Sequence, residues 1–356
     1  MKIEKNFGGN YNYIIGKLLS FPILIIVLKI LSDLPTGKSN NLIYSVILVG
    51  TLVNGTIGQS ILQHGFSSKK STIIFTFNFT IIEFLLIALT GIFNGLNILA
   101  NKSTALVVLA YVFFRVITMI LTNNLYQSKH YIQSLNFIFS KVIDLFLVYY
   151  IYLNINHIDL LPQDPSIKFN LLSVILLLLI SLTNAYLNFK KLFINMVFRL
   201  PVSLLYLIFS FLFFNFAADL VKVNSSYLLR LKGLFDVLAS IVSVTSLKEN
   251  ILKRPLIKNF PILILFNIFS SFIIHYSVIL GLVFFSLAAI FSAKIYSRTI
   301  IIYGVFWYSF AWSLSLLTAI SIILFNANLS IIAYAVCESL PLIIIYLLDF
   351  RLKRNG

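Results

Sequence analysis

The sequence predicts an all-α protein that crosses a membrane many times. Of its 356 residues, 60% are hydrophobic and only 11% are charged, whereas about a quarter of the residues are charged in an average soluble domain. The mean hydropathy is +0.98, and apolar runs of the roughly 20 residues needed to cross a bilayer recur along the chain. These observations predict about 12 membrane-spanning helices, with 10 as the lower limit.

The apolar runs, taken in order, give the expected spans. Residues 260–293 fit either two short helices that meet at His275 or one long tilted helix. The twelve candidate spans are Tyr13–Ser32, Leu42–Gln63, Ile73–Phe93, Thr104–Asn124, Ser134–Leu153, Asn170–Phe189, Met196–Phe216, Tyr227–Lys248, Phe260–His275, Ser277–Ala293, Thr299–Phe325 and Leu329–Asp349.

The loop charges predict the orientation of these spans. If the N-terminus faces the cytoplasm, most of the 27 Lys and Arg residues fall in inner segments and few fall in outer ones. This bias is the positive-inside pattern, and it requires two spans within residues 260–293. We therefore expect both termini in the cytoplasm. The net charge of +16 is explained by inner loops that face anionic lipid, so no nucleic-acid partner is expected.

A weak internal repeat predicts two lobes. Lys17 followed by Pro22 in the first span matches Arg199 followed by Pro201 in the seventh. The next helix in each half opens with a tyrosine and, six positions later, a glycine. Transporters are commonly built from such repeats, with the substrate site between them. The predicted six-helix lobes are residues 1–189 and 190–356.

Two charged residues stand near the middle of predicted spans. Arg115 lies in the fourth span and Glu83 in the third. A charge at this depth is costly and usually faces a cavity or a partner. We expect Arg115 either to line a cavity or to form an ion pair with Glu83.

Two further pairs share a helix face by their spacing. Lys141 and Asp144 are three residues apart in the fifth span, and Lys232 and Asp236 are four apart in the eighth. Each pair either neutralises itself or offers its charges to a ligand. Arg230 points elsewhere on the eighth helix, near the outer surface.

Lys17 and Arg199 lie near the inner surface, where long side chains can reach water along the lipid boundary. The hydrophobic setting of these cations predicts an anionic ligand such as a phosphate or diphosphate. The candidate substrate-binding residues are Arg115, Lys141, Arg230 and Lys232, with Lys17 and Arg199 as lesser candidates. The candidate carboxylates for a coupling proton or sodium ion are Glu83, Asp144 and Asp236, and spacing does not choose among them.

Motifs of several enzyme classes are absent from the sequence. There is no GxxxxGK[ST] phosphate-binding loop, so no built-in ATPase is expected, and there is no HExxH metal motif. The single cysteine, Cys337, excludes an intramolecular disulfide. We therefore expect a protein that is not an enzyme, with no catalytic residues, no metal and no cofactor.

The layout resembles the polysaccharide and oligosaccharide flippases of the MATE-like superfamily over nearly the whole chain. Residues 52–70 (LVNGTIGQSILQHGFSSKK) are similar to the Gly-rich second helix of that family, and residues 121–147 (LTNNLYQSKHYIQSLNFIFSKVIDLFL) are similar to its short polar inner loop. Leu200–Pro201, Asp219 and Tyr227 resemble its seventh and eighth spans. The chain departs from the family in being shorter, and in having Leu220 where a basic residue commonly follows the aspartate.

The resemblance implies two helical bundles around a cationic central cavity that work by alternating access. The implied cargo is an undecaprenyl-diphosphate-linked oligosaccharide, flipped across the bacterial cytoplasmic membrane for lipopolysaccharide O-antigen or capsule synthesis. Implied partners are membrane lipids, a polysaccharide polymerase and a chain-length regulator. Two alternatives stay open: a membrane-embedded polysaccharide polymerase or ligase, and a MATE-type small-molecule exporter. The largest predicted outer loop, residues 154–169, has no arginine, which disfavours the polymerase.

Overall fold

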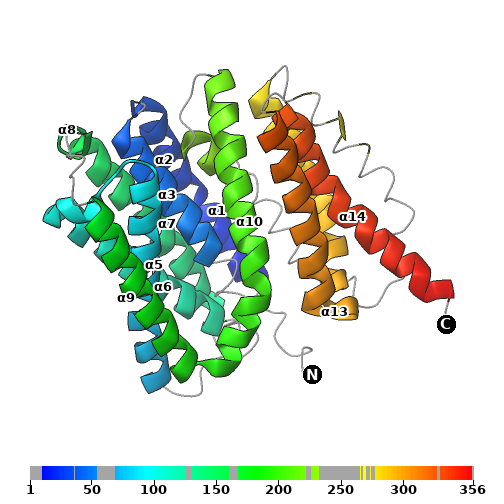
Figure 1. Ribbon diagram of the computed structural model, residues 1–356, viewed down its shortest axis with the longest axis horizontal. Coiled ribbons are helices and arrows are strands. Elements are labelled where there is room, and N and C mark those ends of the chain that lie inside the picture. The colour runs from blue at the N-terminus through cyan, green and yellow to red at the C-terminus, as the bar shows by residue number, and fades with distance from the viewer. Residues whose placement is uncertain are drawn as a thin grey trace. The chain divides into compact units, whose positions relative to one another are not determined.

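The computed structural model shows a helical protein without strands in the residues that it describes (Figure 1). The all-α prediction is confirmed for this part of the chain. The described residues are 10–35, 37–53, 69–125, 130–159, 167–221, 226–231, 265, 268–269, 273, 277–326 and 329–354.

The helices follow one another with short connections where both sides are described. In chain order they are α1 (Asn10–Leu19), α2 (Phe21–Asp33), α3 (Lys38–Val53), α5 (Lys69–Phe93), the 3-10 turn η3 (Ile98–Ala100), α6 (Lys102–Leu125), α7 (His130–Leu153), α8 (Ile155–Asp159), α9 (Ile167–Asn188), α10 (Lys190–Val221), α13 (Val278–Phe325) and α14 (Ser330–Arg354).

Six helical stretches within the described residues are long and apolar enough to cross a membrane. The chain is therefore a multi-pass membrane protein, while the count of twelve spans and the cytoplasmic termini stay predictions. The six stretches are Ile15–Asp33, Ser71–Phe93, Lys102–Leu121, Leu135–Leu153, Leu171–Asn188 and Phe306–Phe325, and shorter apolar helices cover Leu200–Phe216 and Ile332–Leu347.

The first predicted span is interrupted after its first half. Its helix ends at Leu19, and α2 begins at Phe21 with Pro22 in its first turn. Proline is favoured there because the first helical N–H groups have no intrahelical acceptor. The Ser20 hydroxyl donates a hydrogen bond of 2.6 Å to the Lys17 carbonyl, which also accepts the Ser20 N–H at 3.2 Å.

The tenth and eleventh predicted spans are not separated by a loop. Helix α13 runs without interruption for 48 residues, and the predicted inner loop from Lys294 to Arg298 lies within it. That separation was wrong for a simple reason: the loop was inferred from charge, yet residues 294–298 contain neither glycine nor proline, so nothing breaks the backbone hydrogen bonds. A helix of this length measures about 72 Å at 1.5 Å per residue, more than twice the apolar thickness of a bilayer.

The contacts divide the chain into two compact units. Unit 1 comprises Met1–Val197 with Asn224–Tyr227, and unit 2 comprises Phe198–Val223 with Leu228–Gly356. The division falls inside α10, four residues before Pro201. Because proline has no N–H, the Val197 carbonyl cannot receive its usual helical bond there. The lobe boundary at residues 189 and 190 stays a prediction.

Helix α5 packs against α3, α6 and α9 in unit 1, and α7 packs against α1, α2 and α6. Leu85 and Ala88 of α5 meet Val174 of α9 in a buried apolar cluster. Nearby on the same pair of helices, the Asn184 amide donates to Asn78 Oδ1 at 3.1 Å. These contacts fix α5 against α9, and the separate packing of α5 on α6 brings their charged side chains together.

Helices α13 and α14 lie side by side in unit 2 (Figure 1). Phe213 of α10 packs on Tyr334 of α14, with ring centroids 4.5 Å apart. The Ser315 hydroxyl of α13 contacts the Cys337 carbonyl at 2.8 Å. That carbonyl lies four residues before Pro341, which cannot donate to it. A side chain from the neighbouring helix therefore replaces the missing backbone bond, as apolar surroundings require.

Candidate functional site in unit 1

The site that the structure builds is an ion pair between α5 and α6. Glu83 and Arg115 both lie near the middle of apolar stretches, and Arg115 Nη1 lies 3.7 Å from Glu83 Oε1. The Glu83 side chain is only 2% exposed and that of Arg115 is 15% exposed. The pairing that the sequence left open as an alternative for Arg115 is present.

The guanidinium of Arg115 reaches across to α3 because α3 has a glycine at the contact. A methyl group added to Gly50 would overlap the Arg115 guanidinium. Arg115 Nη1 also donates to the Val46 carbonyl at 3.5 Å, one turn earlier on α3. The backbone of α3 therefore forms a cradle for the guanidinium that any larger residue at position 50 would fill.

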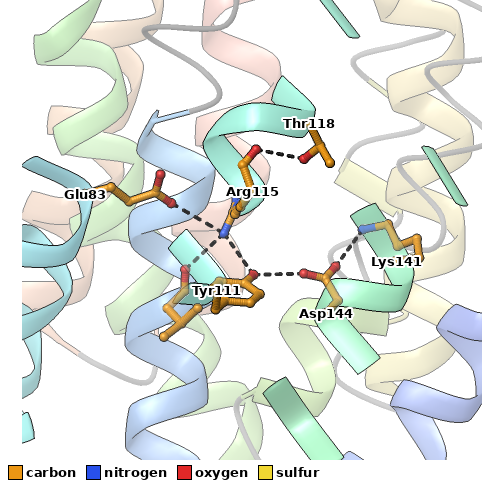
Figure 2. Close-up of polar contacts among 7 residues, drawn as sticks. Glu83, Tyr111, Arg115, Thr118, Lys141 and Asp144 are labelled. Carbon is orange, nitrogen blue, oxygen red and sulfur yellow. Dashed lines mark hydrogen bonds and ion pairs between the residues drawn. The ribbon is translucent and has the colours of Figure 1, made fainter. Parts of the chain in front are cut away.

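A tyrosine joins this ion pair to a second one (Figure 2). Arg115 Nη1 donates to Tyr111 Oη at 3.2 Å, and the Tyr111 hydroxyl donates to Asp144 Oδ1 of α7 at 2.8 Å. Asp144 Oδ2 in turn accepts a hydrogen bond of 2.9 Å from Lys141. The i, i+3 spacing left this pairing open as one of two alternatives, and the pair is present.

We call Glu83, Tyr111, Arg115, Lys141 and Asp144 the charge network. It draws side chains from three helices, and the dashed lines in Figure 2 follow it from Glu83 to Lys141 without a gap. Two cations and two carboxylates give it no formal net charge. Arg115 and Lys141 were predicted as cations for an anionic ligand, and in this structure each of them faces a carboxylate.

Lys17 lies on α1, which packs against α7. Its ammonium group stands over the Phe137 ring of α7, 4.6 Å from the centroid. A cation over an aromatic face is attracted by the ring quadrupole. The Lys17 side chain therefore contacts α7 within unit 1.

The remaining predicted site residues are Arg230, Arg199, Lys232 and Asp236. Arg230 belongs to unit 2 and lies in a short helical stretch, residues 226–231, with a half-buried side chain. Arg199 lies within α10, but its side chain is outside the described set. Lys232 and Asp236 lie outside the described residues, so their predicted pairing stays a prediction.

Tyr111 and Gly50 are the members of the site that the sequence analysis did not assign. Tyr111 precedes Arg115 by four residues, so the two share a helix face, and this spacing could have indicated it. Gly50 is the glycine that follows Tyr44 by six positions in the repeat pattern, and nothing in the sequence connects it with Arg115. Within the described residues, no three His, Cys, Asp or Glu side chains gather where they could hold a metal ion.

Comparisons of the chain with protein-family models, with curated protein sequences and with solved structures gave no match.

Proposed function

We propose that this protein is a membrane transporter of the flippase type, which moves a lipid-linked oligosaccharide across the bacterial cytoplasmic membrane by binding its diphosphate. The observation that carries the proposal is the charge network in the middle of three apolar helices. Ionisable groups at this depth are rare and mark ligand, ion or proton pathways by default. The resemblance of the span layout to lipid-linked oligosaccharide flippases supplies the cargo.

Stability alone is a poor reason for such a network. Replacing a buried ion pair by apolar residues of similar volume is often neutral or even stabilising. A helix bundle in lipid can pack α5, α6 and α7 with apolar and small side chains at no such desolvation cost. The four charges that this bundle retains at mid-span therefore favour a working role over a purely structural one.

The pairing of the cations adds a condition to the proposal. Arg115 and Lys141 each lie beside a carboxylate, so an anionic cargo must compete with Glu83 or Asp144 for them. Binding of the diphosphate therefore requires that at least one of these pairs be neutralised or parted. Transport by alternating access provides a change of state in which this can happen.

The proposal is tested with purified full-length protein in liposomes that contain a polyprenyl-diphosphate-linked oligosaccharide. An added glycosidase digests only the sugars on the outer leaflet, so the protected fraction reports translocation. We expect the wild-type protein to make the inner pool accessible with time, and Arg115→Met to abolish this. Lys29→Ala, which alters an exposed cation of an ion pair in α2, is the matched control and should translocate normally.

Two outcomes would contradict the proposal. If the wild-type protein leaves the inner pool protected, and cells without the gene still carry surface polysaccharide, the flippase assignment fails. If cells without the gene accumulate lipid-linked repeat units on the outer leaflet, a polymerase or ligase is favoured, because translocation then precedes the missing step. Accumulation on the cytoplasmic leaflet supports the flippase.

A further inference from the structure

The two carboxylates of the charge network are held very differently. Asp144 accepts hydrogen bonds from Lys141 at 2.9 Å and from Tyr111 at 2.8 Å, one on each oxygen. Glu83 has Arg115 as its ionic partner at 3.7 Å, and its buried Oε1 has no hydrogen bond within the described residues. Hydrogen bonds to a carboxylate favour its charged form, whereas burial without them favours the protonated form. Glu83 is therefore the carboxylate of the network that is poised to take up a proton.

The surroundings of Glu83 contain few other charges that could respond in its place. Helix α6 presents Arg115 and Tyr111, with Asp144 and Lys141 of α7 beyond them. Helix α3 contributes the backbone at Val46 and Gly50, and α9 meets α5 through the uncharged amide of Asn184. Within the described residues, no charged side chain of α3 or α9 contacts Glu83.

Within the described residues, Nε and Nη2 of Arg115 make no hydrogen bond, so these are the donors that it can offer to a ligand. Within the described residues, the hydrogen bonds and the ion pair of its guanidinium all involve Nη1, which meets Glu83, Tyr111 and Val46. Nη2 lies over the bare Cα of Gly50, and Nη2 and Nε form the edge of the guanidinium that binds phosphate oxygens in a bidentate manner. The Arg115 side chain is also the more exposed member of the pair.

We propose that Glu83 masks Arg115 and that protonation of Glu83 turns the guanidinium into a binding site for a diphosphate. One proton passes from a hydronium ion of the bulk solvent to the Glu83 carboxylate: an O–H bond of the hydronium breaks and leaves a water molecule, and a new O–H bond makes Glu83 a neutral carboxylic acid. The network changes from no net charge to a charge of +1, which is carried by Arg115 beside Tyr111 and Gly50. Proton uptake and anion binding then favour each other. Protonation removes the Glu83 carboxylate that competes with the diphosphate for Arg115, and a bound diphosphate repels the charged form of Glu83. The inference rests on the proposed function for the identity of the diphosphate carrier.

The test measures the affinity of the full-length protein in nanodiscs for farnesyl diphosphate, in acidic and in mildly alkaline buffer. Glu83→Gln has the shape of the protonated residue and no charge, so it should bind the probe more tightly than wild type in alkaline buffer. Coupling between two sites typically changes an affinity about 5- to 150-fold. We expect the affinity of Glu83→Gln divided by that of wild type to lie in this range in alkaline buffer. In acidic buffer the ratio should approach one. Titration of the probe itself cancels in this ratio.

Asp144→Asn is the matched control, since it removes the other carboxylate of the same network. It should not reproduce the tight binding in alkaline buffer, and Arg115→Gln should lose binding in both buffers. A second arm replaces the probe by inorganic pyrophosphate. Tighter binding of farnesyl diphosphate assigns the site to a lipid carrier, and equal binding assigns it to a free diphosphate.

An infrared difference spectrum of the wild-type protein detects the protonated acid directly. Binding of farnesyl diphosphate should produce the carbonyl stretch of a protonated carboxylic acid, and Asp144→Asn should retain this band. The inference is overturned if wild type and Glu83→Gln bind the probe equally in alkaline buffer, or if no protonated acid forms on binding. Neither result contradicts the flippase proposal. That proposal fails separately, if the liposome assay shows no translocation.

Discussion

The described helix contacts of units 1 and 2 use different polar chemistry. In unit 1, α5, α6 and α7 share two ion pairs joined by the Tyr111 hydroxyl. In unit 2, α13 and α14 share a neutral hydrogen bond from Ser315 to a carbonyl that Pro341 leaves without its backbone donor. The neutral contact satisfies a backbone group and nothing more. The charged contact has more than one protonation state, so only the contact in unit 1 can respond to a proton or an anion.

Arg115→Met should have the largest effect on stability. It leaves the Glu83 carboxylate buried without its partner, and breaking a buried ion pair in this way costs about 3–5 kcal/mol. The measurement is the free energy of unfolding in mixed detergent micelles. Adding Glu83→Gln should restore most of the loss, because the orphaned charge is removed. A double variant as unstable as the single one would mean that the two side chains are not coupled.

Gly50→Ala should have the second-largest effect on stability. Its methyl group would overlap the Arg115 guanidinium, and forcing extra volume into a packed interior typically costs about 1–3 kcal/mol. The same substitution made together with Arg115→Met should cost much less, since the overlapping atoms are gone. Equal destabilisation in both backgrounds, measured by the same unfolding experiment, would contradict the cradle on α3.

Tyr111→Phe isolates the bridge between the two ion pairs. It keeps the ring but loses the hydroxyl that contacts Asp144 and Arg115, and hydrogen bonds to charged groups contribute about 1.5–3 kcal/mol. We expect a loss near the lower limit, because Asp144 keeps Lys141. Tyr152→Phe, at an exposed position of α7, is the control and should unfold as wild type does.

Ser315→Ala tests the neutral contact of unit 2. Hydrogen bonds between membrane helices average about 0.6 kcal/mol in double-mutant cycles, so a small decrease in stability is expected. In a Pro341→Ala background the new backbone N–H can bond to the Cys337 carbonyl, and Ser315→Ala should then cost still less. A larger cost in that background would show that the hydroxyl has another role.

Lys29→Ala should have the smallest effect. Lys29 and Asp33 form an i, i+4 ion pair of 3.2 Å, but their side chains are 74% and 47% exposed. Exposed pairs of this kind contribute at most about 0.5–1 kcal/mol, so the unfolding free energy should scarcely change. A loss as large as that of Arg115→Met would show that burial is not what separates these two ion pairs.

The sequence by itself determined the class of the protein and the contacts that lie along one helix. Apolar runs such as Ile73–Phe93 and Thr104–Asn124 gave helices close to their predicted limits, because a membrane leaves a backbone few alternatives to internal hydrogen bonding. The shared helix face of Lys141 and Asp144 followed from helical periodicity alone, and the two side chains pair on it. The unbroken course of α13 did not follow, since charged residues suggested a loop where no residue breaks a helix.

Only the tertiary structure decided which groups meet across helices. Glu83 and Arg115 were possible partners from their depth in two spans, but the register of α5 on α6 brings Nη1 to Oε1. The same register places the Arg115 guanidinium on Gly50 and leaves Glu83 with fewer hydrogen bonds than Asp144. Spacing along the chain fixes the face of each helix, but its rotation and height against a neighbour are set by the packing of many side chains at once.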